Sequence, residues 1–98
     1  MAVYVDTLIP CVTNKRWRYT HSCHLIGDTE EELVAFAVSI GLKSFWIQRT
    51  GIVHFDLNDS KRKQAVKAGA IEIDRNQFVE KLRKVRQFRR KRKRIYAP

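Results

Sequence analysis

The sequence lacks the features that mark a membrane or secreted protein. No apolar run in its 98 residues approaches the roughly 20 residues that a membrane-spanning helix needs. The N-terminus has no basic stretch followed by a long apolar one, so we expect a first strand there and not a signal peptide. Only two cysteines are present, Cys11 and Cys23, which is too few for a disulfide framework. We therefore expect a cytoplasmic protein with reduced thiols and no membrane partner.

Acidic residues are almost absent from the last quarter of the chain. Residues 75–98 contain eleven lysines and arginines but a single acid, Glu80, whereas residues 1–74 contain nine residues of each sign. All of the formal net charge of +10 therefore lies in residues 75–98. The sequence predicts a neutral α+β domain over residues 1–74, and a basic C-terminal helix and tail over residues 75–98 that pack on it or extend from it.

Hydrophobic periodicity and turn residues divide the chain into short elements. Apolar or alternating runs predict strands over residues 2–5, 23–26, 44–48, 52–57 and 70–73. Capped or amphipathic stretches predict helices from residue 28 or 29 to 40, from 58 to 68 and from 75 to about 94. Between residues 23 and 73 this order is βαββαβ. We therefore predict an α+β fold with a small antiparallel or mixed sheet of ferredoxin-like order, an extra N-terminal strand and a basic C-terminal helix.

Local signals mark where the predicted helices begin. Asp28 and Thr29 each stand three residues before a glutamate, which is the spacing of a capping box. Asn58 precedes the second helix as a candidate N-cap, and Asp74 with Gln77 forms a third capping pair. The sequence therefore assigns Asp28 a structural role as a cap.

The basic C-terminal part predicts a partner that carries phosphate. On a helix, Phe78, Leu82 and Val85 would face the domain, and most of the cations would occupy the remaining surface. The cations that we expect to contact phosphate are Arg83, Lys84, Arg86, Arg89, Arg90, Lys91, Arg92, Lys93 and Arg94. Like charges at these spacings repel one another, so we expect full order only when phosphates neutralise them. The alternatives are a solvated tail and, more weakly, an anionic membrane.

Two further basic stretches could support the same function. The first, Lys15, Arg16, Trp17, Arg18 and Tyr19, alternates charge with aromatic rings, a composition suited to stacking on unpaired bases. The second, Lys61, Arg62 and Lys63, places cations in the first turns of a helix, where acids are usual, so they could serve an external anion. The alternatives are an aromatic ring that anchors the loop and a solvated helix face.

A group of polar residues offers a different chemistry. Asp6, His24, His54 and Asp56 could meet across the sheet, because His54 and Asp56 share one face of their predicted strand. Carboxylates and imidazoles that converge in this way can bind a divalent metal and support hydrolysis. No known metal or catalytic motif is present, and His21 and Cys23 do not extend the group. We therefore assign no metal and no cofactor, except a divalent metal under a hydrolase alternative.

Seven short motifs lie between Ala2 and Ile73. They are Val3-Tyr4-Val5-Asp6, the stretch from Cys23 to Leu33 (CHLIGDTEEEL), Ile40-Gly41-Leu42, Trp46-Ile47-Gln48, His54-Phe55-Asp56-Leu57, Ser60-Lys61-Arg62 and Ala68-Gly69-Ala70. In order and spacing they resemble a family of small phage and bacterial proteins of unknown function. The resemblance implies a self-contained domain and a phage or mobile-element origin, and it implies no mechanism. The polar residues inside the motifs raise interest in a shared site: Asp6, His24, Asp28, His54, Asp56, Ser60 and Lys61.

The sequence as a whole favours a small basic protein that binds nucleic acid through the phosphate backbone. Strong sequence specificity is not expected, because no zinc finger, homeodomain or aromatic RNA-binding motif appears. A first alternative is a metal-assisted phosphodiesterase or other hydrolase that uses Asp6, His24, His54 and Asp56 while the tail delivers substrate. A second alternative is an accessory protein whose tail docks on an acidic protein or an RNA-rich machine. An enzyme is the less favoured reading.

Overall fold

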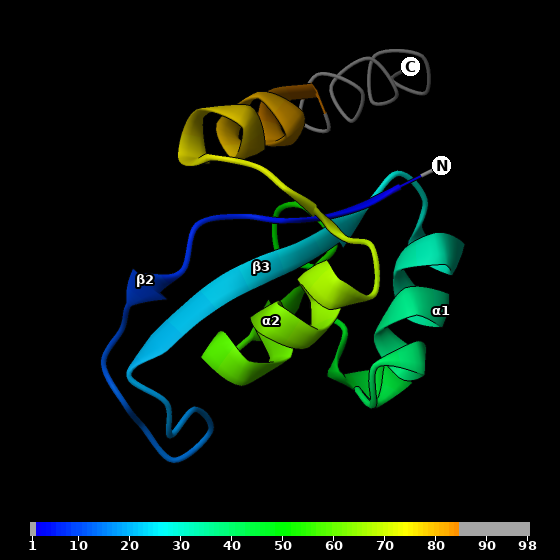
Figure 1. The fold of residues 1–98 in the computed structure, drawn as a ribbon. Helices are drawn as coiled ribbons and strands as arrows, with labels where there is room; N and C mark the ends of the chain where they lie inside the picture. The colour runs from blue at the N-terminus through cyan, green and yellow to red at the C-terminus, as the bar shows by residue number, and fades with distance from the viewer. Residues whose placement is uncertain (1, 85–98) are drawn as a thin grey trace, which may run out of the picture.

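The computed structural model describes residues 2–84, and its fold is drawn in Figure 1. Five strands form a mixed sheet: β1 (Val3–Val5), β2 (Ile9–Pro10), β3 (His21–Gly27), β4 (Phe55–Leu57) and β5 (Ile71–Glu72). The helices are α1 (Glu30–Ser39), the short 3-10 helix η1 (Ser44–Trp46), α2 (Asp59–Lys67) and a helical segment over residues 75–84. The α+β class that the sequence predicts is confirmed.

The strand β3 organises the sheet. Leu25 in its middle pairs with Val5 of β1 and with Phe55 of β4, so β3 lies between these two strands and is antiparallel to both. The first two residues of β3 also pair with β2. On the far side of β1, β5 runs parallel to it. A central strand with neighbours on both edges holds the side chains of three strands in fixed register.

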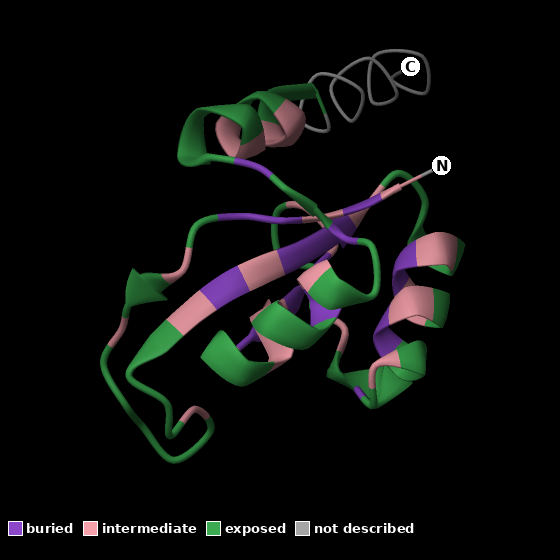
Figure 2. Ribbon diagram, in the orientation of Figure 1, coloured by how far each residue is buried: buried purple, intermediate pink, exposed green. Residues whose placement is uncertain are grey.

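One face of the sheet carries the hydrophobic core. Alternate residues of the paired strands point to this face, and Val5, Leu25 and Leu57 are completely buried there. Helices α1 and α2 cover it, as Figure 1 shows, and contribute Leu33 and Ala65 to the same cluster. In Figure 2 the buried residues accordingly follow the strands and the inner sides of these two helices. This packing makes the sheet a rigid support for the residues on its other face.

The segment over residues 75–84 lies against the other face. Its start carries the predicted capping pair: the backbone N–H of Asp74 donates to Gln77 Oε1 at 2.9 Å, and that of Gln77 donates to Asp74 Oδ1 at 2.8 Å. The ring of Phe78 stacks on the imidazole of His24 with centroids 4.8 Å apart. Lys81 Nζ lies 3.9 Å from the centre of the Tyr4 ring. The sheet therefore has helical cover on both faces.

The predicted βαββαβ order is not confirmed, because one expected strand does not form. Residues 44–46 make the 3-10 helix η1, and the side chains of Phe45 and Trp46 stay exposed. Only Gln48 keeps part of the expected hairpin, in an isolated bridge to His54. A strand forms where several consecutive residues pair with a neighbouring strand, and in residues 44–48 only Gln48 is paired. Conversely, one strand forms that is not predicted: residues 7–22, for which the sequence predicts no element, contain the short strand β2.

Of the predicted caps of α1 and α2, two are confirmed and one is wrong. Thr29 Oγ1 accepts from the backbone N–H of Glu32 at 3.2 Å, and Asn58 Oδ1 accepts from that of Lys61 at 2.8 Å. The prediction that Asp28 is a cap is wrong. Its carboxylate instead accepts from the backbone N–H of Ala2 at 2.9 Å and from the Tyr4 hydroxyl at 3.0 Å, which ties β1 to the end of β3. Within residues 2–84, no helix combines the length and apolar content needed to cross a membrane.

Candidate metal centre

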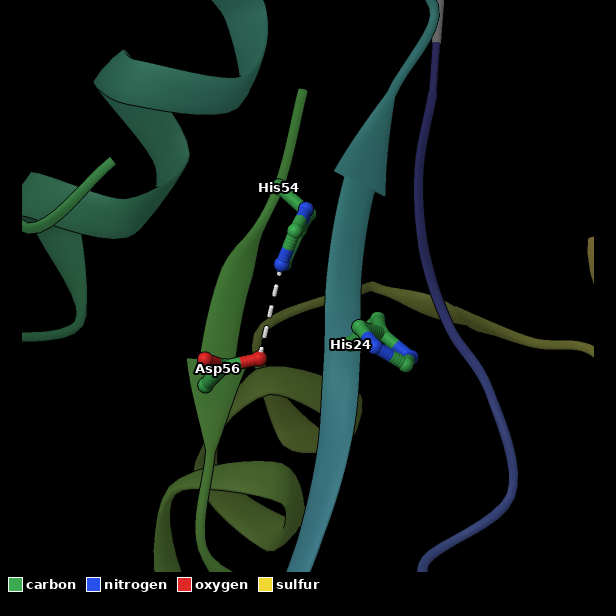
Figure 3. A group of neighbouring side chains, drawn as sticks. All are labelled: His24, His54 and Asp56. Carbon is green, nitrogen blue, oxygen red and sulfur yellow. Dashed lines mark ion pairs between the residues drawn. The ribbon is translucent and has the colours of Figure 1, made fainter. Parts of the chain in front are cut away.

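The four polar residues that the sequence proposes as a hydrolytic group come together on the face opposite the core. Asp56 of β4 is paired with His24 of β3, and His54 stands two residues before Asp56 on the same face. Asp6 follows β1 directly and faces His24 from the other side. Figure 3 shows His24, His54 and Asp56 at the point where β3 and β4 run side by side. Three strands of fixed register therefore position the group.

Asp6 holds the imidazole of His24 in one orientation. Its Oδ2 lies 2.7 Å from His24 Nδ1, and its Oδ1 accepts from the backbone N–H of His24 at 2.6 Å. The hydrogen bond to this buried carboxylate raises the pKa of His24 above its ordinary value, although burial of the ring acts in the opposite direction. Because Nδ1 faces a carboxylate, the proton of the neutral ring is assigned to Nδ1 and the lone pair to Nε2.

His54 is oriented in the same sense by a different acceptor. Its Nδ1 lies 2.7 Å from the carbonyl oxygen of Ile52, which can only accept, so Nδ1 carries the proton and Nε2 is free to bind. That Nε2 lies 3.6 Å from Asp56 Oδ1. The other oxygen of Asp56 accepts a hydrogen bond from Gln48 Nε2. Each of the three groups is therefore fixed by a second residue that acts from outside the cluster.

This arrangement fits a divalent transition metal. One ligand atom from each of His24, His54 and Asp56 lies within 4.8 Å of the other two. Ligand atoms of a tetrahedral site lie roughly 3.4 Å apart when the metal bonds are about 2.1 Å long. The separation of 3.6 Å between His54 and Asp56 matches this value, and the other ligand atoms, within 4.8 Å, must approach each other by at most about 1.4 Å. Two imidazoles and one carboxylate leave further coordination positions for water or substrate, as in catalytic zinc and iron sites.

The centre is partly covered by neighbouring rings and partly exposed. Phe78 covers the outer face of His24, and the His24 and His54 rings meet edge to face at 5.0 Å. The side chains of His24 and Asp56 are 33% and 29% exposed, against 11% for His54. Two cavities, of about 490 and 280 Å³, lie next to Asp56 and Gln48. Both His24 and Asp56 are therefore partly accessible, and the two cavities lie beside Asp56.

The predicted basic loop forms a wall of both cavities. Arg16 and Trp17 line each of them, and Tyr19 lines the larger one. Lys15 and Arg18 are exposed. The loop has a defined turn, because Asn14 Oδ1 accepts from the backbone N–H groups of Arg16 and Trp17 at 2.8 and 2.9 Å. The structure thus brings part of this loop to the polar group, a connection that the sequence does not predict.

The predicted cations at the start of α2 all have partners within the protein. Lys61 Nζ donates to the carbonyl oxygen of Ile40 at 2.7 Å and still borders the larger cavity. Arg62 donates to the carbonyl oxygen of Asp6 and to Glu72, each at 3.0 Å. Lys63 Nζ lies 3.4 Å from a carboxylate oxygen of Asp59. Of the three, Lys61 is the one placed to meet a ligand in the larger cavity.

The remaining predicted residues lie apart from the centre or outside the described residues. Arg83 and Lys84 are exposed at the end of the segment over residues 75–84. The predicted phosphate contacts Arg86, Arg89, Arg90, Lys91, Arg92, Lys93 and Arg94 lie outside the described residues. His21 is exposed. Burial raises the pKa of the Cys23 thiol to about 12, so this neighbour of His24 stays protonated at neutral pH.

Two residues of the site do not appear among the sequence candidates. Gln48 lies in the Trp46-Ile47-Gln48 motif, and its position opposite His54 in a hairpin is the signal that could have identified it. Phe78 is predicted to face the domain, and its stacking on His24 is consistent with that prediction. Its particular neighbour depends on which sheet face the segment covers, and the sequence does not specify this.

Comparison with known proteins adds a family to this geometry. The sequence profile of a family described as "Protein of unknown function (DUF4031)" matches residues 3–85. The chain belongs to this family. The matched region contains Asp6, His24, His54 and Asp56, and it ends before the cluster of cations from Arg86 to Arg94. No curated protein and no solved structure matches the chain. The family of unknown function implied by the resemblance is thereby confirmed.

Proposed function

We propose that the protein is a metal-assisted hydrolase of phosphate esters, with His24, His54 and Asp56 as the metal ligands. The observation that carries the proposal is the orientation of both imidazoles. Each ring has its Nδ1 engaged by an oxygen acceptor, 2.7 Å away in both cases, and one ligand atom of each ring lies within 4.8 Å of a ligand atom of Asp56. Oriented imidazoles with outer hydrogen bonds are the usual arrangement around catalytic metals.

The donor set defines the kind of metal. Two nitrogens and one carboxylate oxygen suit Zn²⁺, Mn²⁺ or Fe²⁺ better than Mg²⁺ or Ca²⁺, which prefer oxygen ligands throughout. Held by His24, His54 and Asp56, such a metal would supply Lewis-acid chemistry toward a phosphoryl oxygen and would lower the pKa of a water nucleophile. In the overall reaction the oxygen of water adds to phosphorus, the bond from phosphorus to the ester oxygen breaks, and a proton from water passes to the leaving alcohol.

The surrounding residues have separate roles. Asp6 keeps the proton of His24 on Nδ1, which leaves the lone pair of Nε2 available for a metal, and its charge would offset part of the charge of that metal. Gln48 orients Asp56 through the outer oxygen of that carboxylate. The cavities beside Asp56 contain the cation Arg16, which favours an anionic substrate.

A hydrolysis assay with matched histidine variants tests this function. Wild-type protein should hydrolyse bis-p-nitrophenyl phosphate, or labelled single-stranded DNA or RNA, with Zn²⁺ or Mn²⁺ and not with EDTA. His54→Ala should reduce the rate at least 100-fold, because it removes a ligand. His21→Ala is the control: it removes an exposed histidine outside the cluster and should leave the rate unchanged. Equal rates for the two variants, or no metal-dependent turnover on any of these substrates, would refute the hydrolase.

Nucleic-acid binding by the basic tail is a second candidate, and the charge distribution favours it. Residues 85–98 contain seven lysines and arginines and no acid. Among residues 2–84, several acids already have partners: Glu30 pairs with Arg49, Glu72 with Arg62, Asp59 with Lys63, and Asp6 with His24. The excess of cations in the tail therefore favours binding to the phosphates of another molecule. The phage or bacterial origin that the resemblance implies stays a prediction.

A further inference from the structure

We infer that the larger cavity beside Asp56 binds one unpaired nucleotide, with the base against the tryptophan rings and the phosphate against Arg16 and Lys61. This inference names the substrate class of the proposed metal centre and in that respect rests on it. The cavity itself is defined without a metal. Its volume is about 490 Å³, within the usual range of small-molecule sites.

The walls of the cavity combine the two chemistries that a nucleotide requires. Both tryptophans of the chain, Trp17 and Trp46, line it together with Tyr19, and flat aromatic rings are the common platform for an unpaired base. Arg16 and Lys61 provide the cations. An apolar ligand would not use these cations, and a phosphate alone would not use three aromatic rings. A base joined to a phosphate uses both.

The aromatic wall is part of a folded loop. Besides the turn at Asn14, the backbone N–H of Cys11 donates to the carbonyl oxygen of Thr20 at 2.8 Å, which closes the base of the loop. The Trp17 and Tyr19 rings meet edge to face, with centroids 5.1 Å apart. Trp17 Nε1 is buried and has no hydrogen-bond partner among the residues that the structure describes. A ligand in the cavity would therefore meet the ring of Trp17 and not this N–H.

The position of the cavity connects it to the metal centre. Asp56 and Gln48 line it, so a nucleotide held there would present its phosphate ester next to the proposed metal ligand. The ammonium of Lys61 uses one of its three donors on Ile40 and keeps the other two for a ligand. An unpaired nucleotide is preferred over duplex because stacking on these rings needs an exposed base face.

Tryptophan fluorescence in EDTA tests the inference without the metal. Both tryptophans line this cavity, so the intrinsic signal reports on it directly. Titration with AMP or UMP should quench fluorescence to saturation, while the nucleoside and ribose 5-phosphate should bind at least fivefold more weakly. Arg16→Ala should weaken mononucleotide binding by about tenfold or more, the loss expected for one hydrogen bond to a charged group.

Two control variants make the result specific. Arg18→Ala removes an exposed cation of the same loop that does not line the cavity, and Phe45→Ala removes an exposed ring next to Trp46 that does not line it either. Both should leave binding unchanged. Equal effects of Arg16→Ala and Arg18→Ala, or no saturable binding in EDTA, would overturn the inference. Zinc titration of EDTA-free samples of the same proteins separates that failure from failure of the metal centre.

Discussion

At the scale of single residues, the centre depends on how each histidine is held. A buried carboxylate holds His24, whereas a neutral backbone carbonyl holds His54. A carboxylate stabilises the imidazolium of its partner, so the pKa of His24 is raised. In a group whose folded pKa is raised, the stabilisation is complete below the ordinary pKa and is lost as pH rises through the folded pKa. The Asp6–His24 pair therefore stabilises the metal-free fold most in acid.

The first prediction concerns this pair in metal-free protein. In the presence of EDTA, the ring protons of His24 should titrate by NMR with a midpoint above 6.5, its ordinary value. Asp6→Asn should lower that midpoint, because it removes the charge that stabilises the imidazolium. A His24 midpoint that does not move in Asp6→Asn would contradict the assigned role of Asp6.

Sequence alone predicted some of these residues because their relation is local. His54 and Asp56 share a face because strands alternate, and β4 confirms this. The convergence of Asp6 and His24 with them was predicted only as one option, since it requires β3 to lie between β1 and β4. Asp28 was misassigned because its spacing to a glutamate is that of a cap, but Thr29 has the same spacing and takes that role. Asp28 instead accepts hydrogen bonds from Ala2 and Tyr4, which are distant from it in the sequence.

At the scale of elements, helix boundaries were predictable and strand pairing was not. Caps and glycines act over a few residues, so α1 and α2 begin directly after the predicted caps Thr29 and Asn58. Gly41 follows α1 with a φ of 92°, a conformation that favours glycine. The run over residues 44–48 has the composition of a strand, but composition does not determine whether a neighbouring strand is available to pair with it. The helix η1 forms there, and its Trp46 borders the larger cavity.

The second prediction measures one of these local signals. Thr29→Ala removes the side-chain oxygen that accepts from Glu32, and it should lower the free energy of unfolding by about 1 kcal/mol. Thr29→Ser keeps the hydroxyl and should cost a few tenths of that amount. Urea denaturation of the three proteins provides the comparison. If the alanine and serine variants are equally stable, the hydroxyl does not act as the cap.

At the scale of the whole molecule, the hydrophobic core and the candidate metal centre lie on opposite faces of the sheet. One face carries the core under α1 and α2, and the opposite face carries the polar group next to the segment over residues 75–84. That segment leads into the basic tail. A polyanion bound by the tail would therefore be held at high local concentration near the centre. We therefore propose that nucleic-acid binding and hydrolysis would be two steps on one substrate.

The third prediction tests the tail through its salt dependence. Replacing the six cations from Arg89 to Arg94 with glutamine should reduce retention on single-stranded nucleic acid and heparin. The slope of log affinity against log salt should become shallower by about 4 if all six contact single-strand phosphates. His54→Ala should retain the wild-type slope. An unchanged slope in the tail variant would refute nucleic-acid binding by the tail, and a complex with a protein that survives nuclease treatment would favour the accessory-protein alternative.

The central claim is that His24, His54 and Asp56 form a metal site, and calorimetric titration of the full chain with Zn²⁺ tests it most directly. Wild-type protein and His21→Ala should each bind one Zn²⁺ with the same affinity. His24→Ala and His54→Ala should each lose at least 100-fold in affinity, while circular dichroism shows that they remain folded. Zn²⁺ binding that is absent from the wild type, or that survives in both of these variants, would contradict the account.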